Sequence, residues 1–340
     1  MTSNRQWVLE ARPLGRELLL SDFRLEAAPV PEIADGQVLI KTLYMSFDPA
    51  QKSWMENIAS YMKPIEIGDA MVGTGAGRVI ESRHPGFAPG DIVRGLIGWR
   101  EFVAAEGASL EKIPPGTSMA ASLSLLGSTG KTAYFGLLNV GKPKPGDTLV
   151  ISGAAGATGS VVGQIGKIAG CRVIGIAGGP EKCAWLTEEL GFDGAIDYKA
   201  EKVRRGLKAL CPDGIDIFYD NVGGEILNDG LARINVGARV VICGGISRYN
   251  ADPRDPEQMP PGPRNYFNVV FTGATIQGFL LQHYEREYPI AEARLAAWAQ
   301  AGKIKYKEDV LEGFERAPEA LMRLFAGKNF GKQLLKVAEG

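Results

Sequence analysis

Short apolar runs alternate with segments of helical spacing between residues 126 and 305. The runs predict buried strands, and the segments between them repeat apolar residues every three to four positions, as amphipathic helices do. Strands that alternate with helices form βαβ units and a doubly wound parallel sheet. The predicted strands are 148–152, 172–177, 194–197, 215–220, 238–243 and 274–278, and the predicted helices are 159–169, 181–190, 201–210, 225–234 and 290–300.

Residues 1–125 follow a different pattern, in which brief strands are separated by glycine and proline turns. Short strands with turns this frequent are typical of a barrel or sandwich. The tail predicts one more helix and a terminal strand that is expected to return to this first domain. The predicted elements are strands 38–44, 73–80, 92–96 and 331–337 and the helix 317–325.

The length of 340 residues favours two domains, because single cores rarely grow beyond about 250–300 residues. We expect a first domain of residues 1–125 with a return over 306–340, and a second, doubly wound domain of residues 126–305. Residues 248–268 hold five prolines and no periodicity. That segment is expected to be an irregular excursion or a lid.

Charge and cysteine usage narrow the class of protein. Lys and Arg number 38 against 39 Asp and Glu, a net charge of −1, which argues against a general nucleic-acid binder or a basic membrane-surface protein. The start of the chain is too polar for a secretory signal, and glycines and polar side chains interrupt the longest uncharged runs. The four cysteines match no metal or disulfide spacing, which favours reduced thiols and a cytoplasmic protein.

A glycine-rich turn at 152–159 follows one predicted strand and opens the next helix. There Gly156 would let the main chain approach a pyrophosphate, and Gly159 would let the helix pack closely on the strand. The helix N-terminus offers free N–H groups to phosphates. We therefore expect cofactor contacts from Ala155, Gly156, Ala157, Thr158 and Gly159. The glycines of 73–77 precede no helix, and a bent strand is expected there.

The end of the second strand of this domain favours NADP over NAD. NAD enzymes place an acidic residue at this position, whereas Ala177 and Gly178 stand here and leave room for a 2′-phosphate. Lys182 is placed to pair with that phosphate, unless it is an ordinary solvated helix charge. A doubly charged phosphate needs more than one donor, and Tyr198 after the third strand is the second candidate.

The remaining strand ends point to the same crevice, because ligands of open α/β sheets bind beyond the carboxyl ends of the strands. We expect contacts to ribose and nicotinamide from the residues that follow the fourth, fifth and sixth strands. An ordinary turn or cap is the alternative for the asparagine among them. These residues are Asn221, Cys243, Ser247, Tyr249, Phe279 and Leu280.

No thiolate, imidazole and carboxylate set suggests a metal site, because the first domain has no cysteine and only His84. No motif for covalent catalysis is present either. Hydride addition to a C=C bond conjugated to a carbonyl requires only hydrogen-bond donors for the enolate. A tyrosine hydroxyl suffices, and Tyr249 follows the fifth strand. Tyr61 is a second candidate from the first domain, and aromatic packing is the alternative for both tyrosines.

Five segments together resemble the zinc-independent medium-chain dehydrogenase/reductases, in particular the branch of prostaglandin, alkenal/one and curcumin reductases. The resemblance covers nearly the whole chain. It departs at 127–130, where the branch usually has a proline, and at 178–180, where a serine and an acid are common. The matching segments are 44–49, 130–137, 154–164, 219–224 and 327–332.

The resemblance implies a GroES-like β-barrel domain, a Rossmann domain, NADPH as cofactor and often a homodimer. It implies reduction of the C=C bond of enones or enals, with Tyr249 at the position of the branch's tyrosine near the carbonyl oxygen. Cofactor-contact positions of the branch match Thr132, Lys182, Tyr198, Asn221 and Asn329.

Two other functions remain compatible with the sequence. The first is an NADPH quinone reductase on the same fold, and the second is a non-catalytic NADPH-binding regulator. Fold alone does not decide among them. A ratio of quinone to enone activity separates the first from the enone reductase. The second would show NADPH-dependent binding of a partner without turnover.

Overall fold

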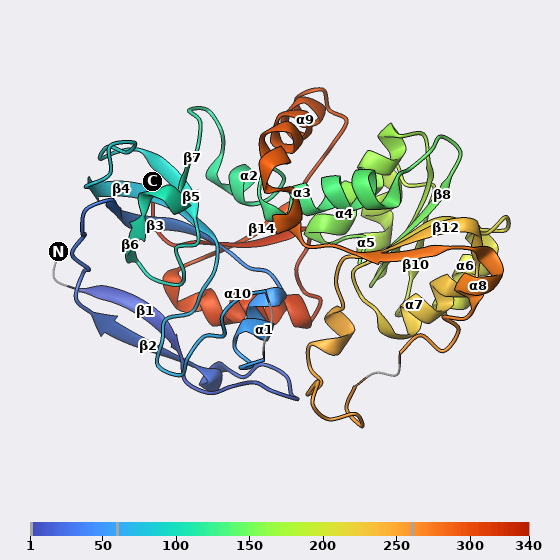
Figure 1. Ribbon diagram of the computed structural model, residues 1–340, viewed down its shortest axis with the longest axis horizontal. Helices are drawn as coiled ribbons and strands as arrows, with labels where there is room; N and C mark the ends of the chain where they lie inside the picture. Colours follow the sequence, from blue (N-terminus) through green and yellow to red (C-terminus); the bar gives the residue numbers. More distant parts are fainter. Residues whose placement is uncertain (1–2, 59–60, 260–261, 340) are drawn as a thin grey trace. The chain divides into compact units, whose positions relative to one another are not determined.

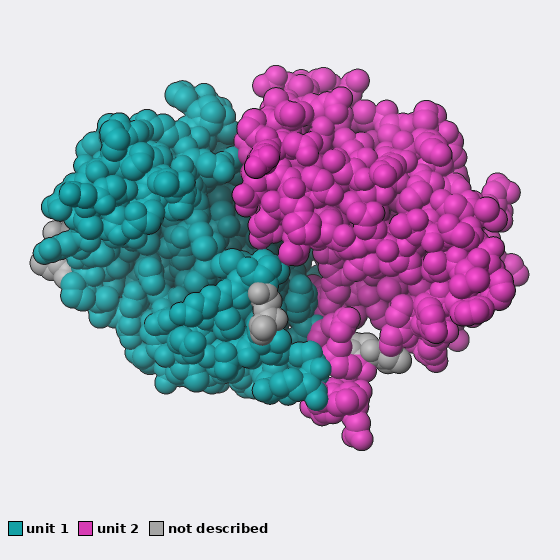
Figure 2. Space-filling view, in the orientation of Figure 1, with its two compact units in different colours: residues 1–123, 249–254, 308–340 teal, residues 124–248, 255–307 magenta. Residues whose placement is uncertain are grey.

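The computed structural model describes residues 3–58, 61–259 and 262–339 (Figure 1). The chain divides into two compact units, which Figure 2 colours separately. Unit 1 comprises residues 1–123, 249–254 and 308–340, and unit 2 comprises residues 124–248 and 255–307. The segment 249–254 therefore belongs to unit 1, although the sequence places it inside the nucleotide-binding domain.

Unit 1 is built on a seven-stranded sheet in the order β14-β15-β3-β4-β5-β7, with β6 also paired to β3. The terminal strand β15 pairs antiparallel with β3, so the predicted return of the tail is confirmed. A separate two-stranded sheet joins β1 and β2. The strands are β1 (Asn4–Leu9), β2 (Phe23–Ala28), β3 (Gln37–Ser46), β4 (Gly75–Ser82), β5 (Ile92–Gly95), β6 (Phe102–Glu106), β7 (Glu111–Lys112), β14 (Glu308–Glu312) and β15 (Lys332–Lys336).

The glycines of β4 have a packing role. A Cβ on Gly75 would lie 2.6 Å from the Tyr44 carbonyl oxygen, and one on Gly77 would lie 2.4 Å from the Lys41 carbonyl oxygen. These glycines let β4 approach β3 closely, and the pairing of the two strands shifts register between Thr42 and Tyr44. The expectation that this glycine-rich segment forms a strand is confirmed. The helices of unit 1 are α1 (Ala50–Trp54), α2 (Met119–Leu123) and α10 (Ala317–Phe325). One of its cores combines side chains of β1, β3 and α10.

Unit 2 contains six parallel strands in the order β10-β9-β8-β11-β12-β13. Numbered along the chain, this is the order 3-2-1-4-5-6 of dinucleotide-binding sheets. The order reverses between β8 and β11, and ligands of such sheets bind at that point. The strands are β8 (Thr148–Ser152), β9 (Arg172–Ala177), β10 (Gly194–Asp197), β11 (Ile215–Asp220), β12 (Ile234–Ile242) and β13 (Thr275–Gly278).

The helices of unit 2 form two contacting groups, as a doubly wound fold requires. Helix α4 packs on β8 and β9 and contacts α3, which contacts α9, whereas α6 and α7 contact each other. The predicted fold class is confirmed as an N-terminal β domain with a Rossmann-like parallel sheet. The helices are α3 (Ser128–Phe135), α4 (Ala157–Ile168), α5 (Pro180–Ala184), α6 (Val203–Leu210), α7 (Gly224–Leu231), α8 (Asn268–Thr272) and α9 (Tyr288–Gln300).

Most boundaries outside the first four strands of unit 2 shift by one to four residues, and in two places the type of element also differs from the prediction. The helix expected over 225–234 ends at Leu231, and Ile234 already begins β12. The helix expected over 181–190 is α5 followed by a wider π-helical turn over Trp185–Glu189. Both segments are apolar enough to continue a helical pattern, so only tertiary pairing reveals where each helix stops. Within the described part of the chain, no helix is both long and apolar enough to cross a membrane.

Candidate functional site

The turn between β8 and α4 requires glycine at two positions. Gly153 has a φ of +61°, in the left-handed region that glycine adopts at little cost. A Cβ on Gly159 would lie 2.4 Å from the Gly153 carbonyl oxygen and 2.8 Å from the Ala154 Cα. Both distances are far inside van der Waals contact. The first turn of α4 is therefore pressed against the strand end, as the sequence motif predicts.

The N-terminus of α4 offers several main-chain donors at this turn. The helix begins after Gly156, and the Ser160 N–H is the first to bond back, to the Gly156 carbonyl at 3.0 Å. The N–H groups of Ala157, Thr158 and Gly159 precede that bond, and no side chain caps them. Such a terminus carries partial positive charge and binds phosphates. Together with Ala155 and Gly156, this turn fits a dinucleotide pyrophosphate.

A buried hydrogen-bond network joins β8 to β11 at the point where the strand order reverses. The Ser152 hydroxyl donates to Asp220 at 2.6 Å and accepts from the Asn221 N–H at 2.8 Å. The Asn221 amide donates to the Ser152 carbonyl at 2.7 Å. Asp220 also accepts from the Gly223 N–H, and its burial raises the pKa of its carboxyl. The network fixes the loop that follows β11.

Sequence reasoning predicted Asn221 but missed Ser152 and Asp220. Both residues end their strands, and those two strands are neighbours in the sheet. The signal was therefore present as polar residues closing two apolar runs. Pairing them required the strand order, which the sequence alone did not give.

The ends of β9 and β10 bring the two predicted 2′-phosphate donors into adjacent segments. A Cβ on Gly178 would lie 2.8 Å from the Tyr198 ring, so that ring rests directly on Gly178. Lys182 lies in α5, two residues after its first residue, Pro180. A side chain at position 178 would therefore meet the Tyr198 ring.

An acid does lie near this strand end, but main-chain groups occupy it. Asp197 accepts from the Gly179 N–H and the Lys199 N–H, both at 2.9 Å. The hydrogen bond from the Gly179 N–H is the largest of the effects that lower the pKa of the Asp197 carboxyl. Both bonds go to Oδ1, through which Asp197 braces the turn after β9.

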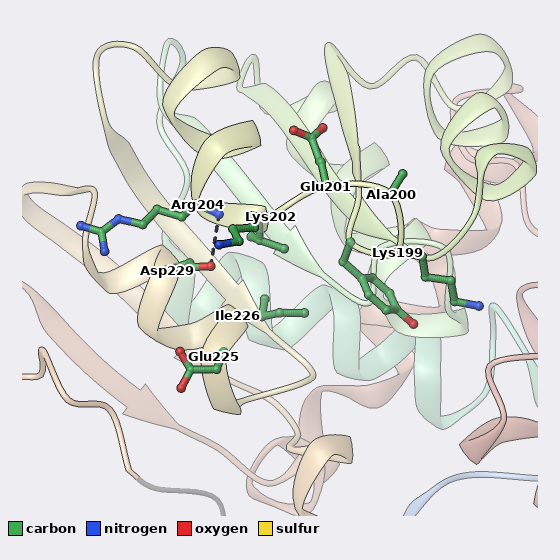
Figure 3. Close-up of a pocket in the computed structure, with 10 residues that line it drawn as sticks. Lys199, Ala200, Glu201, Lys202, Arg204, Glu225, Ile226 and Asp229 are labelled. Atoms are coloured by element: carbon green, nitrogen blue, oxygen red, sulfur yellow. Dashed lines mark hydrogen bonds between the residues drawn. The ribbon is translucent and has the colours of Figure 1, made fainter.

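Tyr198 also borders a pocket of about 610 Å³ in unit 2 (Figure 3). The Arg204 N–H donates to Asp229 at 3.1 Å across this pocket. Figure 3 shows the side chains of Lys199 and Arg204 pointing to opposite sides, so they do not converge on one anion. Its lining has equal numbers of cations and acids: Tyr198, Lys199, Ala200, Glu201, Lys202, Val203, Arg204, Glu225, Ile226 and Asp229.

Hydrogen bonds to main-chain carbonyls hold the loop after β12 beside the loop after β11. The Cys243 N–H donates to the Asp220 carbonyl at 2.9 Å, and the Ser247 hydroxyl donates to the Val222 carbonyl at 2.6 Å. Burial raises the pKa of the Cys243 thiol to about 11, which favours the protonated thiol over the thiolate at neutral pH. The predicted residues Asn221, Cys243 and Ser247 are thus neighbours.

The sixth strand end is linked to helix α3. A Cβ on Gly136 would lie 2.5 Å from the Phe279 ring. The buried Tyr219 hydroxyl donates to the Thr132 carbonyl at 3.1 Å. Thr132 and Phe279 are therefore both anchored near the end of the sheet, and Leu280, next along the chain, is partly exposed.

Three predicted residues lie in unit 1. The Tyr249 ring packs edge-on against Phe325 with centroids 6.2 Å apart, and its main-chain carbonyl accepts from the Lys52 ammonium. Tyr61 is half exposed and lies edge-on to Trp54. The Asn329 amide donates to the Gly331 carbonyl at 3.0 Å, within its own loop.

Metal-ligating side chains do not gather in the described residues. Across 3–58, 61–259 and 262–339, no group of three or more His, Cys, Asp or Glu side chains is placed to hold a metal ion. The single imidazole of unit 1, His84, accepts from the Gly86 N–H at 3.0 Å.

The strand order, the glycine turn and the helix N-terminus define a dinucleotide-binding α/β protein with an added β domain. Family models match two parts of the chain: the N-terminal domain of oxidoreductase over residues 5–113 and zinc-binding dehydrogenase over residues 157–297. Full-length relatives, 38–44% identical, show that the chain belongs to the medium-chain dehydrogenase/reductases, in the branch whose members work without zinc.

Relatives and solved structures agree with this family. A putative NADP-dependent oxidoreductase YfmJ of Bacillus subtilis is 44% identical over 100% of this chain and 99% of its own length. An NADPH-dependent curcumin reductase of Escherichia coli is 42% identical over 98% of this chain and 97% of its own. The structure of CurA from Vibrio vulnificus in complex with NADPH has a TM-score of 0.93 and 38% identity, covering 99% of this chain and 100% of that one.

Proposed function

We propose that this protein is an NADPH-dependent reductase of the C=C bond in α,β-unsaturated ketones and aldehydes. The glycine turn at 153–159, where the strand order of the sheet reverses, supports the binding of a dinucleotide. The 42% identity to an NADPH-dependent curcumin reductase supports the cofactor and the reaction. A prostaglandin reductase 1 of Bos taurus, 38% identical over 99% of this chain, supports the same class of substrate.

NADPH, when bound, supplies the two electrons as a hydride for the β-carbon of the substrate. The chain's own residues bind the cofactor and stabilise the substrate oxygen. The first turn of α4 holds the pyrophosphate, and the Tyr249 hydroxyl donates to the enolate oxygen that develops at the carbonyl. A solvent proton adds to the α-carbon, which leaves the saturated carbonyl compound and NADP⁺. Tyr61 is proposed to contact the substrate.

Oxidation of NADPH, followed by its near-ultraviolet absorbance with a panel of enones, tests this function. We expect rapid oxidation and a saturated ketone as product, identified by mass spectrometry. Turnover of quinones with none of the enones would instead identify a quinone reductase. Tight NADPH binding without turnover of either class would favour a regulator.

Loss of the Lys182 ammonium is expected to affect NADPH and spare NADH. We propose that Lys182 and Tyr198 bind the 2′-phosphate, and one charge-assisted hydrogen bond contributes about 1.5–3 kcal/mol. Lys182→Ala should therefore raise the KM for NADPH about 10- to 100-fold, with the KM for NADH unchanged in steady-state assays. Lys208→Ala, an exposed lysine at the end of α6, is the control. Equal effects on both cofactors would contradict the phosphate role.

We infer that two copies associate through β13. This strand ends the sheet of unit 2, and all four of its residues are exposed. The opposite edge strand, β10, alternates buried and half-buried residues. Helix α8 beside β12 exposes Val270 and Phe271, at 65% and 74%. An open edge beside exposed apolar side chains is the kind of surface that pairs with a second copy.

A charge on this edge is expected to separate the copies. The wild-type protein should scatter light at twice the chain mass of 36.5 kDa. Ile276→Arg should elute near the single mass, because pairing would bury the guanidinium. Val310→Arg places the same charge at a similarly exposed position on the edge strand β14 of unit 1 and should remain dimeric. A dimeric Ile276→Arg would refute this interface.

We further propose a cytoplasmic location, which the four free cysteines support. Burial raises the pKa of the Cys171 and Cys211 thiols to about 11.

A further inference from the structure

A lysine of unit 1 is completely buried and uses all of its hydrogen-bonding capacity. Lys52 lies in α1, and its side chain is 0% exposed. Its ammonium donates to the Glu56 carboxylate at 2.6 Å, to the Pro13 carbonyl at 3.3 Å and to the Tyr249 carbonyl. An ammonium has three N–H donors, so each donor has one acceptor. These acceptors come from three separate segments of the chain.

Burying the Lys52–Glu56 ion pair costs free energy, because both charged groups lose their hydration. Glu56 is 6% exposed, and its burial raises the pKa of its carboxyl against the opposing effect of Lys52. Apolar side chains of similar volume often replace a buried ion pair without loss of stability, whereas some such pairs fix one specific arrangement. The third acceptor of the Lys52 ammonium, the Tyr249 carbonyl, shows which segment of the chain this pair holds in place.

That acceptor belongs to the segment 249–254, which lies between two stretches of unit 2 in sequence and packs with unit 1. Lys52 and Tyr249 are 197 positions apart. The ammonium fixes the main chain of Tyr249, while Phe325 packs against its ring. Ala251 is also buried, at 9% exposure. Two independent contacts, one polar and one aromatic, thus determine where the phenol lies.

We propose that Lys52, neutralised by Glu56, is a positioning residue that holds the Tyr249 hydroxyl in place for the reaction. The inference rests on the proposed function, in which that hydroxyl donates to the enolate. Lys52 touches neither cofactor nor substrate in this account. It acts through the Tyr249 main chain, so its effect on turnover depends on the Tyr249 hydroxyl being present.

A double-mutant cycle separates positioning from general stability. The paired change Lys52→Met with Glu56→Gln removes both charges together and leaves no uncompensated buried charge. We expect kcat for a small enone to fall about 10- to 100-fold, since a displacement of about 1 Å can cost that much. In the Tyr249→Phe background, the same paired change should lower kcat less than twofold further. The Kd for NADPH, from its fluorescence, should change less than twofold.

Hydrogen exchange gives a readout that does not involve activity. Amides of residues 249–254 should exchange at least tenfold faster in the paired variant than in the wild type. Arg94→Met with Glu111→Gln is the matched control, because it removes another ion pair with a largely buried cation in unit 1. That control should alter neither the exchange of 249–254 nor kcat. If the paired Lys52 variant does not fold by circular dichroism, Lys52→Arg is carried through the same cycle and exchange measurement.

The outcomes distinguish the two proposals. If Tyr249→Phe alone leaves kcat unchanged, the catalytic role of Tyr249 fails, whatever Lys52 does. If Tyr249→Phe lowers kcat, and the paired Lys52 change lowers kcat by the same factor in the Tyr249→Phe background as in the wild type, the positioning role fails and the proposed function stands. Unchanged exchange of 249–254 would overturn the positioning role as well. Non-additive kcat values with faster local exchange support it.

Discussion

Tyr249→Phe is expected to lower kcat for enone reduction by about 100- to 1000-fold, the range measured when one donor to a developing oxyanion is removed. The substitution deletes a single oxygen. The ring keeps its packing against Phe325, and the main-chain carbonyl keeps its bond from Lys52. The loss should therefore appear in the chemical step. The Kd for NADPH should stay within about twofold, because the donors assigned to its phosphates lie elsewhere.

Steady-state kinetics with several enones, together with NADPH titration by fluorescence, check this expectation. Tyr306→Phe is the matched control, because it deletes a hydroxyl from a partly exposed tyrosine outside the proposed site. It should leave kcat unchanged. Wild-type turnover by Tyr249→Phe on every enone would remove this residue from the mechanism. A parallel loss of NADPH affinity would mean that the hydroxyl serves the cofactor.

Buried parallel strands were the most predictable part of the fold. Four strands of unit 2 coincide with their predicted bounds: Thr148–Ser152, Arg172–Ala177, Gly194–Asp197 and Ile215–Asp220. A strand covered on both faces reads as a continuous apolar run, and its ends are marked by turn residues. The pattern therefore carries both the type and the limits of each element.

Elements whose residues run against their usual preferences were not predictable. Helix α3 includes Gly130, where a Cβ would lie 1.7 Å from the Leu125 carbonyl oxygen. Close packing requires this glycine, although glycine disfavours helices by about 1 kcal/mol relative to alanine. Strand β1 mixes polar and apolar residues, and its partner β2 supplies the stability. The hydrophobic pattern shows neither the close packing at Gly130 nor the strand partner of β1.

The candidate site divides in the same way. The turn at 153–159 could be predicted because its glycines meet requirements that arise within the turn itself. Gly153 has a positive φ, and Gly159 lies too close to the Gly153 carbonyl for a side chain. Lys52 could not, because a single lysine in a short helix has no pattern and its partner carbonyl lies 197 positions away. The sequence also placed 249–254 with unit 2, and only the contacts of that segment assign it to unit 1.

Gly159→Ala is expected to weaken NADPH binding about 10- to 100-fold, from the roughly 1–3 kcal/mol that overpacking costs. The new Cβ would lie 2.4 Å from the Gly153 carbonyl oxygen and 2.8 Å from the Ala154 Cα. Both contacts are main chain, so no flexible side chain can yield. The first turn of α4 must move away from the strand end, and its N–H groups then no longer meet the pyrophosphate.

Helix propensity alone predicts that Gly159→Ala makes α4 more stable, so it gives no reason for weaker NADPH binding. Alanine in place of a helical glycine should stabilise α4 by about 1 kcal/mol, so a weaker complex must come from the close approach. Titration calorimetry gives the Kd for NADPH, and thermal unfolding without and with NADPH should show a smaller ligand-induced rise in Tm. Gly262→Ala, where a Cβ meets nothing within 4 Å, should bind as the wild type does. Undiminished affinity in Gly159→Ala would show that the pyrophosphate does not rest on this turn.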